Sequence, residues 1–156
     1  MRKKITGQGQ EPSSAQDQWL DLELLAEAEI SSEDAGFPIE FAIRPDCKEG
    51  WRAGHSGEQV IRFIFAQLQR IKRIRLVFLE QGQTRTQEFA LAWLGQNDST
   101  PREIVRQQYN FNPPQNIREV EDYQVDLHGV KAIELRIRPD ISGGDNRASL
   151  SLIQIA

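Results

Sequence analysis

The stretch Ile133-Glu134-Leu135-Arg136-Ile137 decides the fold class of this chain. Apolar side chains occupy every second position, and charged side chains stand between them. Because successive side chains of a β-strand point to opposite faces, this segment can bury one face on a core and leave the other in water. The pattern predicts a strand in a sheet with one buried face.

The same alternation recurs on both sides of this stretch, with almost no helical periodicity between the runs. The other alternating apolar sets are Leu20, Leu22 and Leu24, continued by Ala26, Ala28 and Ile30; Ile39, Phe41 and Ile43; Ile61, Phe63 and Phe65; Ile74, Leu76 and Phe78; Phe89, Leu91 and Trp93; and Tyr123, Val125 and Leu127. Seven such runs separated by turn-rich segments predict an all-β antiparallel sandwich. We expect one core between two sheets, containing Phe63, Phe78, Trp93, Leu135 and Ile137.

Loops of such a sandwich are where function is expected. If the strands run antiparallel in sequence order, the segments 44–57, 81–84, 110–118 and 139–147 fall at one end and form a rim. The dipeptide His128-Gly129 is interpreted as a turn between two strands.

Residues 57–75 allow a second interpretation. The residues Ile61, Ile64, Phe65, Leu68 and Ile71 also fit helical spacing, and five Arg or Lys side chains would form a basic face, as in a helix that binds a membrane surface or a partner. Abundant Ile and Phe favour instead two strands joined by a polar connector over 67–70.

Length and composition bound the class of protein. A chain of 156 residues with 38% apolar and 27% charged residues predicts one globular domain, over 18–156, behind a flexible arm over 1–17. The net charge of -4 argues against binding nucleic acid by general charge attraction. Cys47 has no partner for an internal disulfide, no secretory signal is visible, and no run approaches the roughly 20 apolar residues of a membrane span. We expect a cytoplasmic protein that binds neither membranes nor nucleic acid.

An ordered series of segments carries a family resemblance. The series is Ile30-Ser31-Ser32-Glu33, Phe37-Pro38-Ile39, Gly50-Trp51-Arg52-Ala53, Gln59-Val60-Ile61-Arg62-Phe63, Ile71 to Leu76, Glu80 to Arg85, Phe89 to Trp93, Ala132 to Ile137 and Ala148 to Leu152. In this order the chain resembles the discoidin, or coagulation-factor type C, domains over roughly residues 28–156. The absence of a cysteine pair fits an intracellular, bacterial-type member, because many secreted members close the domain with a disulfide.

The resemblance implies a jelly roll of the galactose-binding-like type that binds rather than catalyses, through loops at one end. The positions matching the sugar-binding residues of such domains are Asp46, Trp51, Arg52, Glu80 and Arg85. Two alternatives stay open here: Trp51 can be a core side chain, and the two arginines can pair with the two acids at the surface.

Chemistry-bearing clusters are weak. Neither His55 nor His128 lies at metal-ligand spacing, no nucleophile-elbow motif is present, and Asp140 with Asp145 forms either a cation loop or a solvated turn. We expect no catalytic residue, no cofactor and no metal. Two classes remain: a module for carbohydrate or another small polar ligand, and a protein-interaction module of an intracellular complex. The second would present Phe111, Pro113 and Pro114 on an exposed loop.

Overall fold

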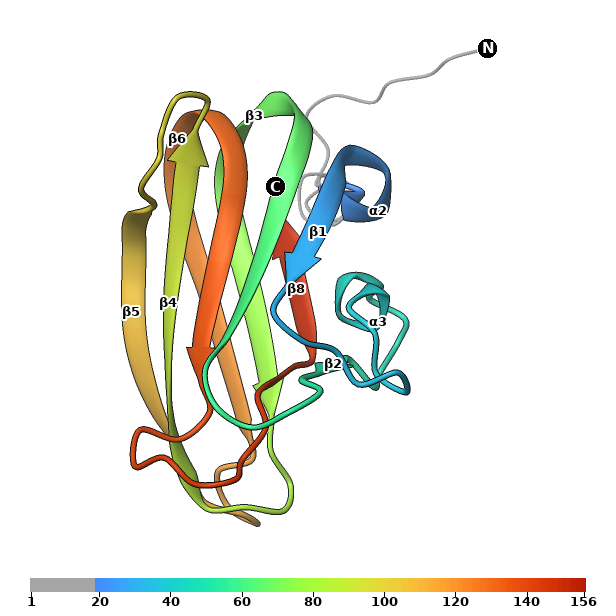
Figure 1. Cartoon of the computed structure of the whole chain (residues 1–156), viewed down its shortest axis with the longest axis vertical. Helices are drawn as coiled ribbons and strands as arrows, with labels where there is room; N and C mark the ends of the chain where they lie inside the picture. The colour runs from blue at the N-terminus through green and yellow to red at the C-terminus, as the bar shows by residue number, and fades with distance from the viewer. Residues whose placement is uncertain (1–18) are drawn as a thin grey trace, which may run out of the picture.

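The computed structural model describes residues 19–156, so the predicted arm over 1–17 lies outside the described residues. Figure 1 shows strands packed in two antiparallel layers, which confirms the predicted all-β sandwich. The elements are α2 (Leu22–Leu25), β1 (Ala26–Ile30), α3 (Glu40–Ile43), β2 (Trp51–Arg52), β3 (Gln59–Leu79), β4 (Arg85–Gly95), β5 (Arg102–Phe111), β6 (Arg118–Arg138), β7 (Ser149–Leu150) and β8 (Leu152–Ile155).

Two long strands join the layers. Strands β3 and β6 have 21 residues each and pair with one another along their length, with register shifts where they bend between the layers. In one layer the first half of β3 pairs with β1 and with the second half of β6, for example Ile61 opposite Leu135, and β4 and β5 follow. In the other layer the second half of β3 pairs with β8 and with the first half of β6, for example Leu76 opposite Glu121.

The bends replace two predicted connections. Residues 67–70, expected as a connector, continue β3, and His128-Gly129, expected as a turn, continues β6 with Gly129 at φ 65°. Both segments are mostly exposed where the strands pass from one layer to the other, so polar residues there do not interrupt the backbone ladder. The same strand excludes the helical interpretation of residues 57–75.

Two predicted strands are short helices instead. The run that begins at Leu20 forms α2 before entering β1, because the Asp21 carboxylate caps the first turn and accepts a hydrogen bond from the Leu24 amide. Residues 39–43 form α3, whose first turn is fixed by the Glu33 carboxylate accepting from the Ile39 amide at 2.7 Å. Local capping therefore overrides alternation at these two places. No helix of residues 19–156 is long and apolar enough to span a membrane.

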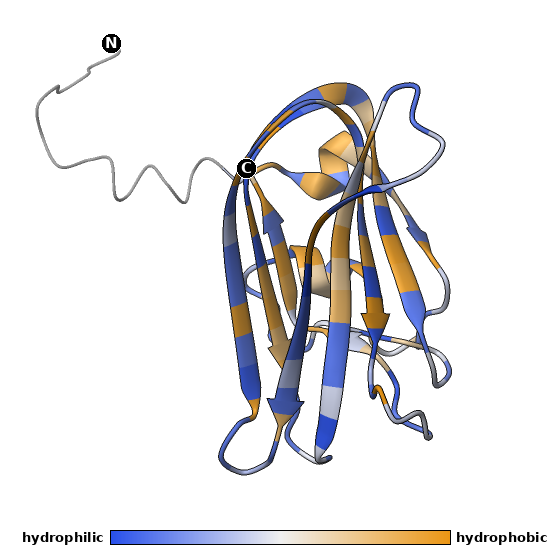
Figure 2. Ribbon diagram, turned by 90° about the vertical axis from the view of Figure 1, so that its left-hand side faces the viewer, coloured by the Kyte–Doolittle hydropathy of each residue, from blue (hydrophilic) through white to orange (hydrophobic). Residues whose placement is uncertain are grey.

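The core lies between the layers, as predicted. Phe63, Phe78, Leu135 and Ile137 are all buried, and the rings of Phe78 and Phe89 meet across the sandwich with centroids 5.3 Å apart. Figure 2 shows the apolar and polar residues alternating along the strands. Trp93 was predicted to be buried in the core, but its side chain is only half-buried near the end of β4. The Arg102 guanidinium lies over its ring, 5.1 Å from the ring centroid.

Strand β5 has no counterpart among the predicted runs. It is the edge strand beyond β4, and the hydroxyl of its Tyr109 donates to the carbonyl of Arg118 at the start of β6, a strand whose half-buried positions include Glu121 and Tyr123. Because the interior at this side of the sandwich is polar, the sequence of β5 does not alternate between apolar and polar residues as the other strands do.

The prediction that Phe111 is displayed on a loop was wrong. Phe111 ends β5, is fully buried, and packs edge-on against Tyr109 with ring centroids 4.9 Å apart. The exposed part of the 110–118 loop therefore lacks the aromatic side chain that a docking surface there was expected to present.

Candidate functional site

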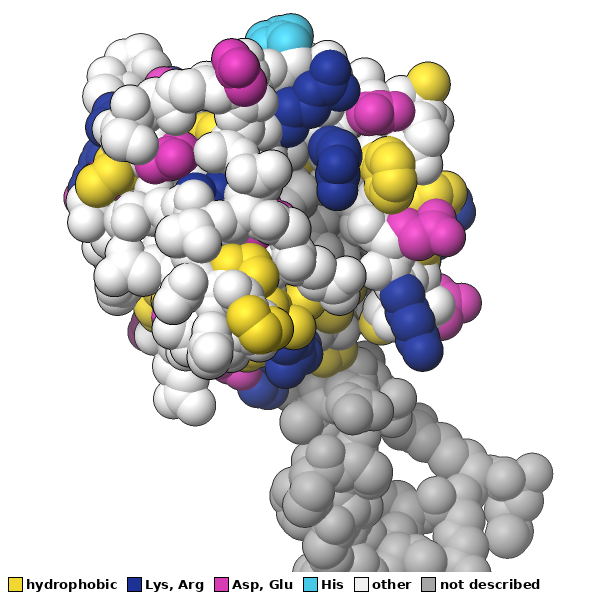
Figure 3. All heavy atoms as spheres, turned by 90° about the horizontal axis from the view of Figure 1, so that it is seen from below, with side chains coloured by type: hydrophobic (Ala, Val, Ile, Leu, Met, Phe, Trp, Pro, Cys, Tyr) yellow, Lys and Arg dark blue, Asp and Glu magenta, His cyan; other side chains and the backbone are white. Residues whose placement is uncertain are grey.

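The connections at one end of the sandwich gather into a rim. In Figure 1 the β3–β4 turn, the β5–β6 loop and the β6–β7 connection all lie at the lower end. Seen from below, this end presents mostly uncharged polar side chains and backbone, with separate basic and acidic side chains and a small group of hydrophobic side chains among them (Figure 3). The surface suits a polar ligand more than an apolar one.

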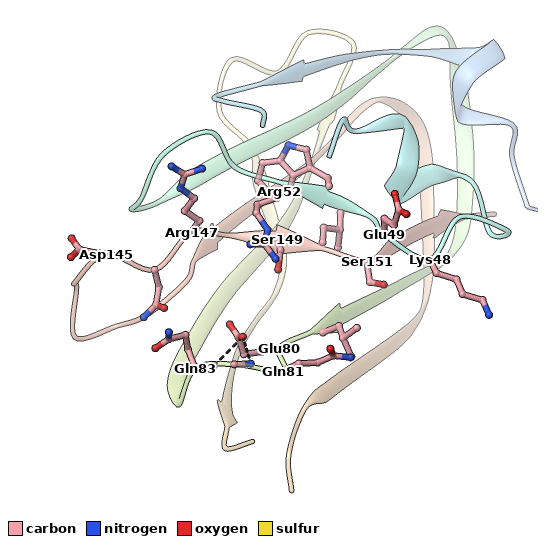
Figure 4. Close-up of a pocket in the computed structure, with 15 residues that line it drawn as sticks. Lys48, Glu49, Arg52, Glu80, Gln81, Gln83, Asp145, Arg147, Ser149 and Ser151 are labelled. Carbon is pink, nitrogen blue, oxygen red and sulfur yellow. Dashed lines mark hydrogen bonds between the residues drawn. The ribbon is translucent and has the colours of Figure 1, made fainter. Parts of the chain in front are cut away.

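A cleft of about 500 Å³ opens at this end, between the β2–β7 pair and the β3–β4 turn. We call it the loop-end cleft. It is lined by Lys48, Glu49, Trp51, Arg52, Leu79, Glu80, Gln81, Gly82, Gln83, Asp145, Asn146, Arg147, Ser149, Leu150 and Ser151. Figure 4 shows Arg52, Arg147 and Ser149 on one wall and Glu80, Gln81 and Gln83 on the other.

The upper wall depends on a close approach of two backbones. Strand β2 pairs with β7 so that Arg52 lies opposite Ser149. The chain enters β2 through Gly50, which has φ 70° and where a Cβ atom would lie 2.5 Å from the Leu150 carbonyl oxygen. Only glycine satisfies both conditions. The Arg52 guanidinium then lies over the Phe37 ring, 5.1 Å from its centroid.

The lower wall is a turn held by Glu80. Its Oε2 accepts hydrogen bonds from the amides of Gly82 and Gln83, at 2.9 and 3.1 Å, and its Oε1 accepts from Arg85 Nε at 2.7 Å. Burial raises the pKa of Glu80, but these hydrogen bonds outweigh burial and hold that pKa below its ordinary value. Glu80 is therefore an ionised carboxylate that orders the turn.

Arg85 lies beneath the cleft. It is 3% exposed, and its Nη1 donates to the Pro139 carbonyl at 2.6 Å and to Gln87 at 3.2 Å, while its guanidinium covers the Phe111 ring. Gln87 in turn donates to the buried carboxyl of Glu119 at 3.2 Å. Arg85, Gln87 and Glu119 form what we call the buried polar cluster, which links the two layers below the lower wall.

The five residues that the resemblance selects have different surroundings. Arg52 and Glu80 both line the cleft, one on each wall. Asp46 is exposed but does not line the cleft. Arg85 does not line the cleft either, and contacts it only through its hydrogen bond to Glu80. The structure thus brings Arg52 and Glu80 together, leaves Asp46 outside and makes Arg85 a support.

Trp51 matches the core alternative left open by the sequence. It is fully buried behind the upper wall, and its indole N–H donates to the Ser32 carbonyl at 3.2 Å. A buried ring cannot present its face to a sugar as an exposed aromatic platform does.

Sequence reasoning singled out neither of two residues of the upper wall, Ser149 and Arg147, although the predicted rim segment 139–147 includes Arg147. Ser149 belongs to β7 and faces β2, a strand nearly the whole domain away in sequence. Arg147 lies two residues before β7, with its Nη1 3.7 Å from Asp34 Oδ2. The apolar residues of β7 and β8 indicate that both are strands, but nothing in the local sequence indicates that β7 pairs with β2.

The other candidates do not form a site. Asp140 accepts hydrogen bonds from Ser142 and Asn146, and the Ser142 hydroxyl chiefly lowers its pKa. Asp145 lies apart, at one end of the cleft. Within residues 19–156 no group of three or more His, Cys, Asp or Glu side chains is placed to hold a metal ion.

The two histidines lie on different elements, His55 in the β2–β3 connection and His128 within β6. His55 contacts Gln59 at 3.3 Å, and His128 contacts Asp126 at 3.1 Å on the exposed bend of β6. Neither lines the loop-end cleft.

No family model matches the chain, and no curated protein sequence matches it. Solved structures do. A pectin-binding carbohydrate-binding module is 18% identical with a TM-score of 0.59, over 84% of this chain and 89% of that one. A family 32 module from Clostridium perfringens, in complex with GalNAc-β-1,3-galactose, is 13% identical with a TM-score of 0.61, over 88% and 98%.

An F5/8 type C domain from Bacteroides fragilis is similar as well, at 14% identity and a TM-score of 0.57 over 88% of this chain and 93% of that one. At such identities the likeness concerns the fold. The chain shares the β-sandwich fold of these modules and of the F5/8 type C domain, which is the fold that the ordered sequence segments predicted.

Proposed function

We propose that this chain is a non-catalytic carbohydrate-binding module whose ligand lies in the loop-end cleft. The observation that carries the proposal is the composition of the two walls. Arg52 and Ser149 offer donors on one side, and the Gln81 and Gln83 amides offer donors and acceptors on the other. Such a set matches sugar hydroxyls, each of which donates and accepts hydrogen bonds.

The walls are also fixed before any ligand arrives. The β2–β7 pair holds one wall, and Glu80 holds the other through Arg85 and two backbone amides. Preorganised walls reduce the conformational entropy lost on binding, which matters for a ligand that binds through hydrogen bonds.

Structural neighbours support the same class. They include the pectin-binding module, the family 32 module in complex with GalNAc-β-1,3-galactose, and a lectin domain of lectinolysin complexed with Lewis B antigen, the last at 10% identity and a TM-score of 0.60. Analogy of fold carries less weight than the site itself, so the proposal rests first on the cleft.

The state of Glu80, the carboxylate that holds the lower wall, supports binding without catalysis. Hydrolysis of a glycosidic bond ordinarily needs two carboxyl groups flanking it, one of them a proton donor with a raised pKa. Glu80 has a lowered pKa, and both of its oxygens already accept hydrogen bonds. It serves the structure of the turn.

A protein-docking function has weaker support. Within the described residues the exposed large apolar side chains are Leu24, Leu68, Val120 and Ile141, and they lie on four different elements or connections. A docking face needs a contiguous patch rather than scattered residues.

A glycan array followed by calorimetric titration of the best glycan tests the proposal. Ser149→Tyr fills the middle of the cleft and should weaken binding at least about tenfold. Gln115→Tyr, on the exposed β5–β6 loop at the same end but outside the cleft, is the matched control and should bind as the wild type does. Unchanged binding by a folded Ser149→Tyr would remove the cleft as the site. If no glycan on the array binds, the carbohydrate function is wrong and protein docking becomes the stronger class.

A further inference from the structure

The loop-end cleft contains a guanidinium without an internal counter-ion. Arg52 is exposed, and no Asp or Glu oxygen of residues 19–156 lies within 4.0 Å of it. Most arginines of this protein do have such a partner: Arg44, Arg73 and Arg106, for example, each pair with a carboxylate at 2.6 to 2.8 Å. Among the described arginines only Arg52 and Arg118 have no such partner, and of these two only Arg52 lines the cleft.

The position of Arg52 is nevertheless fixed. Its amide donates to the Phe37 carbonyl at 3.1 Å, its carbonyl accepts from the Asp34 amide at 2.9 Å, and its guanidinium lies over the Phe37 ring. A cation held by stacking keeps the edge of its planar group free for hydrogen bonds. Figure 4 shows the Arg52 side chain in the middle of the cleft, beside Ser149.

The acidic residues around the cleft do not neutralise this charge. Glu80 is ion-paired with Arg85 at 2.7 Å, so that charge is already balanced. In Figure 4 Asp145 lies at one end of the cleft, and Glu49 lies toward the other end near Lys48. Arg147 stands next to Arg52 on the same wall, and its charge is balanced by the Asp34 carboxylate, whose Oδ2 lies 3.7 Å from Arg147 Nη1. The middle of the cleft therefore favours an anion.

We infer that the ligand of the loop-end cleft is an acidic saccharide, and that Arg52 binds its carboxylate. This rests on the proposed function. A guanidinium donates two parallel N–H bonds to a carboxylate, a geometry that a neutral hydroxyl cannot match, and charge-assisted hydrogen bonds are roughly twice as strong as neutral ones. A uronic acid residue carries such a carboxylate on a ring whose hydroxyls the amide wall can bind. The opposite wall, with Gln81 and Gln83, then contacts the uncharged part of the sugar.

Pairs of ligands that differ only in the charged group test this inference. Trigalacturonate, trimannuronate and triglucuronate are each titrated beside the corresponding methyl ester, which keeps every ring and hydroxyl and lacks the anion. For at least one pair the acid should bind about tenfold tighter than the ester, and the difference should shrink as salt is added. Arg52→Gln should lower the affinity for the acid much more than the affinity for the ester, so that the preference for the acid is lost. Arg70→Gln, on the distant bend of β3, is the control and should keep the preference.

Three results would overturn the inference. Equal affinity for acid and ester in every pair, or binding of neutral glycans alone, would show a neutral-sugar cleft and leave the proposed function standing. A preference for the acid that survives Arg52→Gln would assign the carboxylate to another residue. Failure of every saccharide, charged or neutral, would remove the inference and the proposed function together.

Discussion

The stability of this protein should depend on pH through one buried carboxyl group. Glu119 is 2% exposed between the two layers, its Oε1 accepts from Gln87, and its Oε2 has no hydrogen-bond partner among the described residues. Burial, followed by the nearby carboxyl of Glu121, raises the pKa of Glu119 to about 9. The hydrogen bond from Gln87 and the charge of Arg85 oppose this shift only in part.

The sign of the effect follows from the direction of the shift. The ordinary pKa of the group is 4.5, so between about pH 4.5 and 9 the folded protein retains a proton that the unfolded chain releases. Stability should therefore fall as pH rises through this window, at up to about 1.4 kcal/mol per pH unit. From about pH 5.5 to 7.5 this one group should lower the free energy of unfolding by about 2 to 3 kcal/mol.

Glu119→Gln tests the effect, because glutamine keeps the shape of the neutral acid and cannot ionise. Urea denaturation at about pH 5.5, 6.5 and 7.5 should show the wild type losing about 2 to 3 kcal/mol relative to this variant. Glu29→Gln, at an exposed position on β1, is the control and should follow the wild type at all three values. If the wild type and Glu119→Gln vary with pH in parallel, Glu119 is ionised in the folded protein and the reasoning from its burial is wrong.

Three further substitutions test the core and the walls of the cleft. Phe78→Ala should lower the free energy of unfolding by about 3 to 5 kcal/mol, because it empties the centre of the core, whereas Val120→Ala on the exposed face should cost under about 1 kcal/mol; equal urea midpoints would contradict the packing. Arg85→Met should cost about 3 to 5 kcal/mol by leaving Glu80 without its charged partner, and a near-neutral effect in urea denaturation would show that the buried polar cluster is dispensable. Gly50→Ala should cost at least about 1 to 3 kcal/mol from backbone strain alone and loosen the upper wall; unchanged amide exchange in β2 and β7 would argue against that.

The sandwich was readable from the sequence wherever both strand faces obeyed one rule, apolar inward and polar outward. Strands β3, β4 and β6 obey it over most of their length, so their predicted core residues other than Trp93 are buried as expected. The rule failed at residues 22–25, where the carboxylate of Asp21 stabilises a helical turn that hydrophobic periodicity does not register. It failed again at β5, because that edge strand faces an interior that is itself polar, around Glu121 and Tyr123. Both failures come from polar contacts that compete with the apolar pattern.

The same alternation rule also predicts which of the site residues Arg52 and Arg85 is buried. Alternation continued back from the buried Phe89 passes through Gln87 to Arg85, so all three point inward, and only hydrogen bonds to Glu80 and Pro139 make a buried arginine tolerable there. Alternation from the buried Trp51 turns Arg52 outward, free for a ligand. Strand alternation therefore predicts which of the two arginines is buried and which is exposed, once one neighbouring side chain is known to be buried. It cannot predict that Ser149 of β7 lies beside Arg52 on the same wall, because β2 and β7 are far apart in sequence and only backbone pairing brings them together.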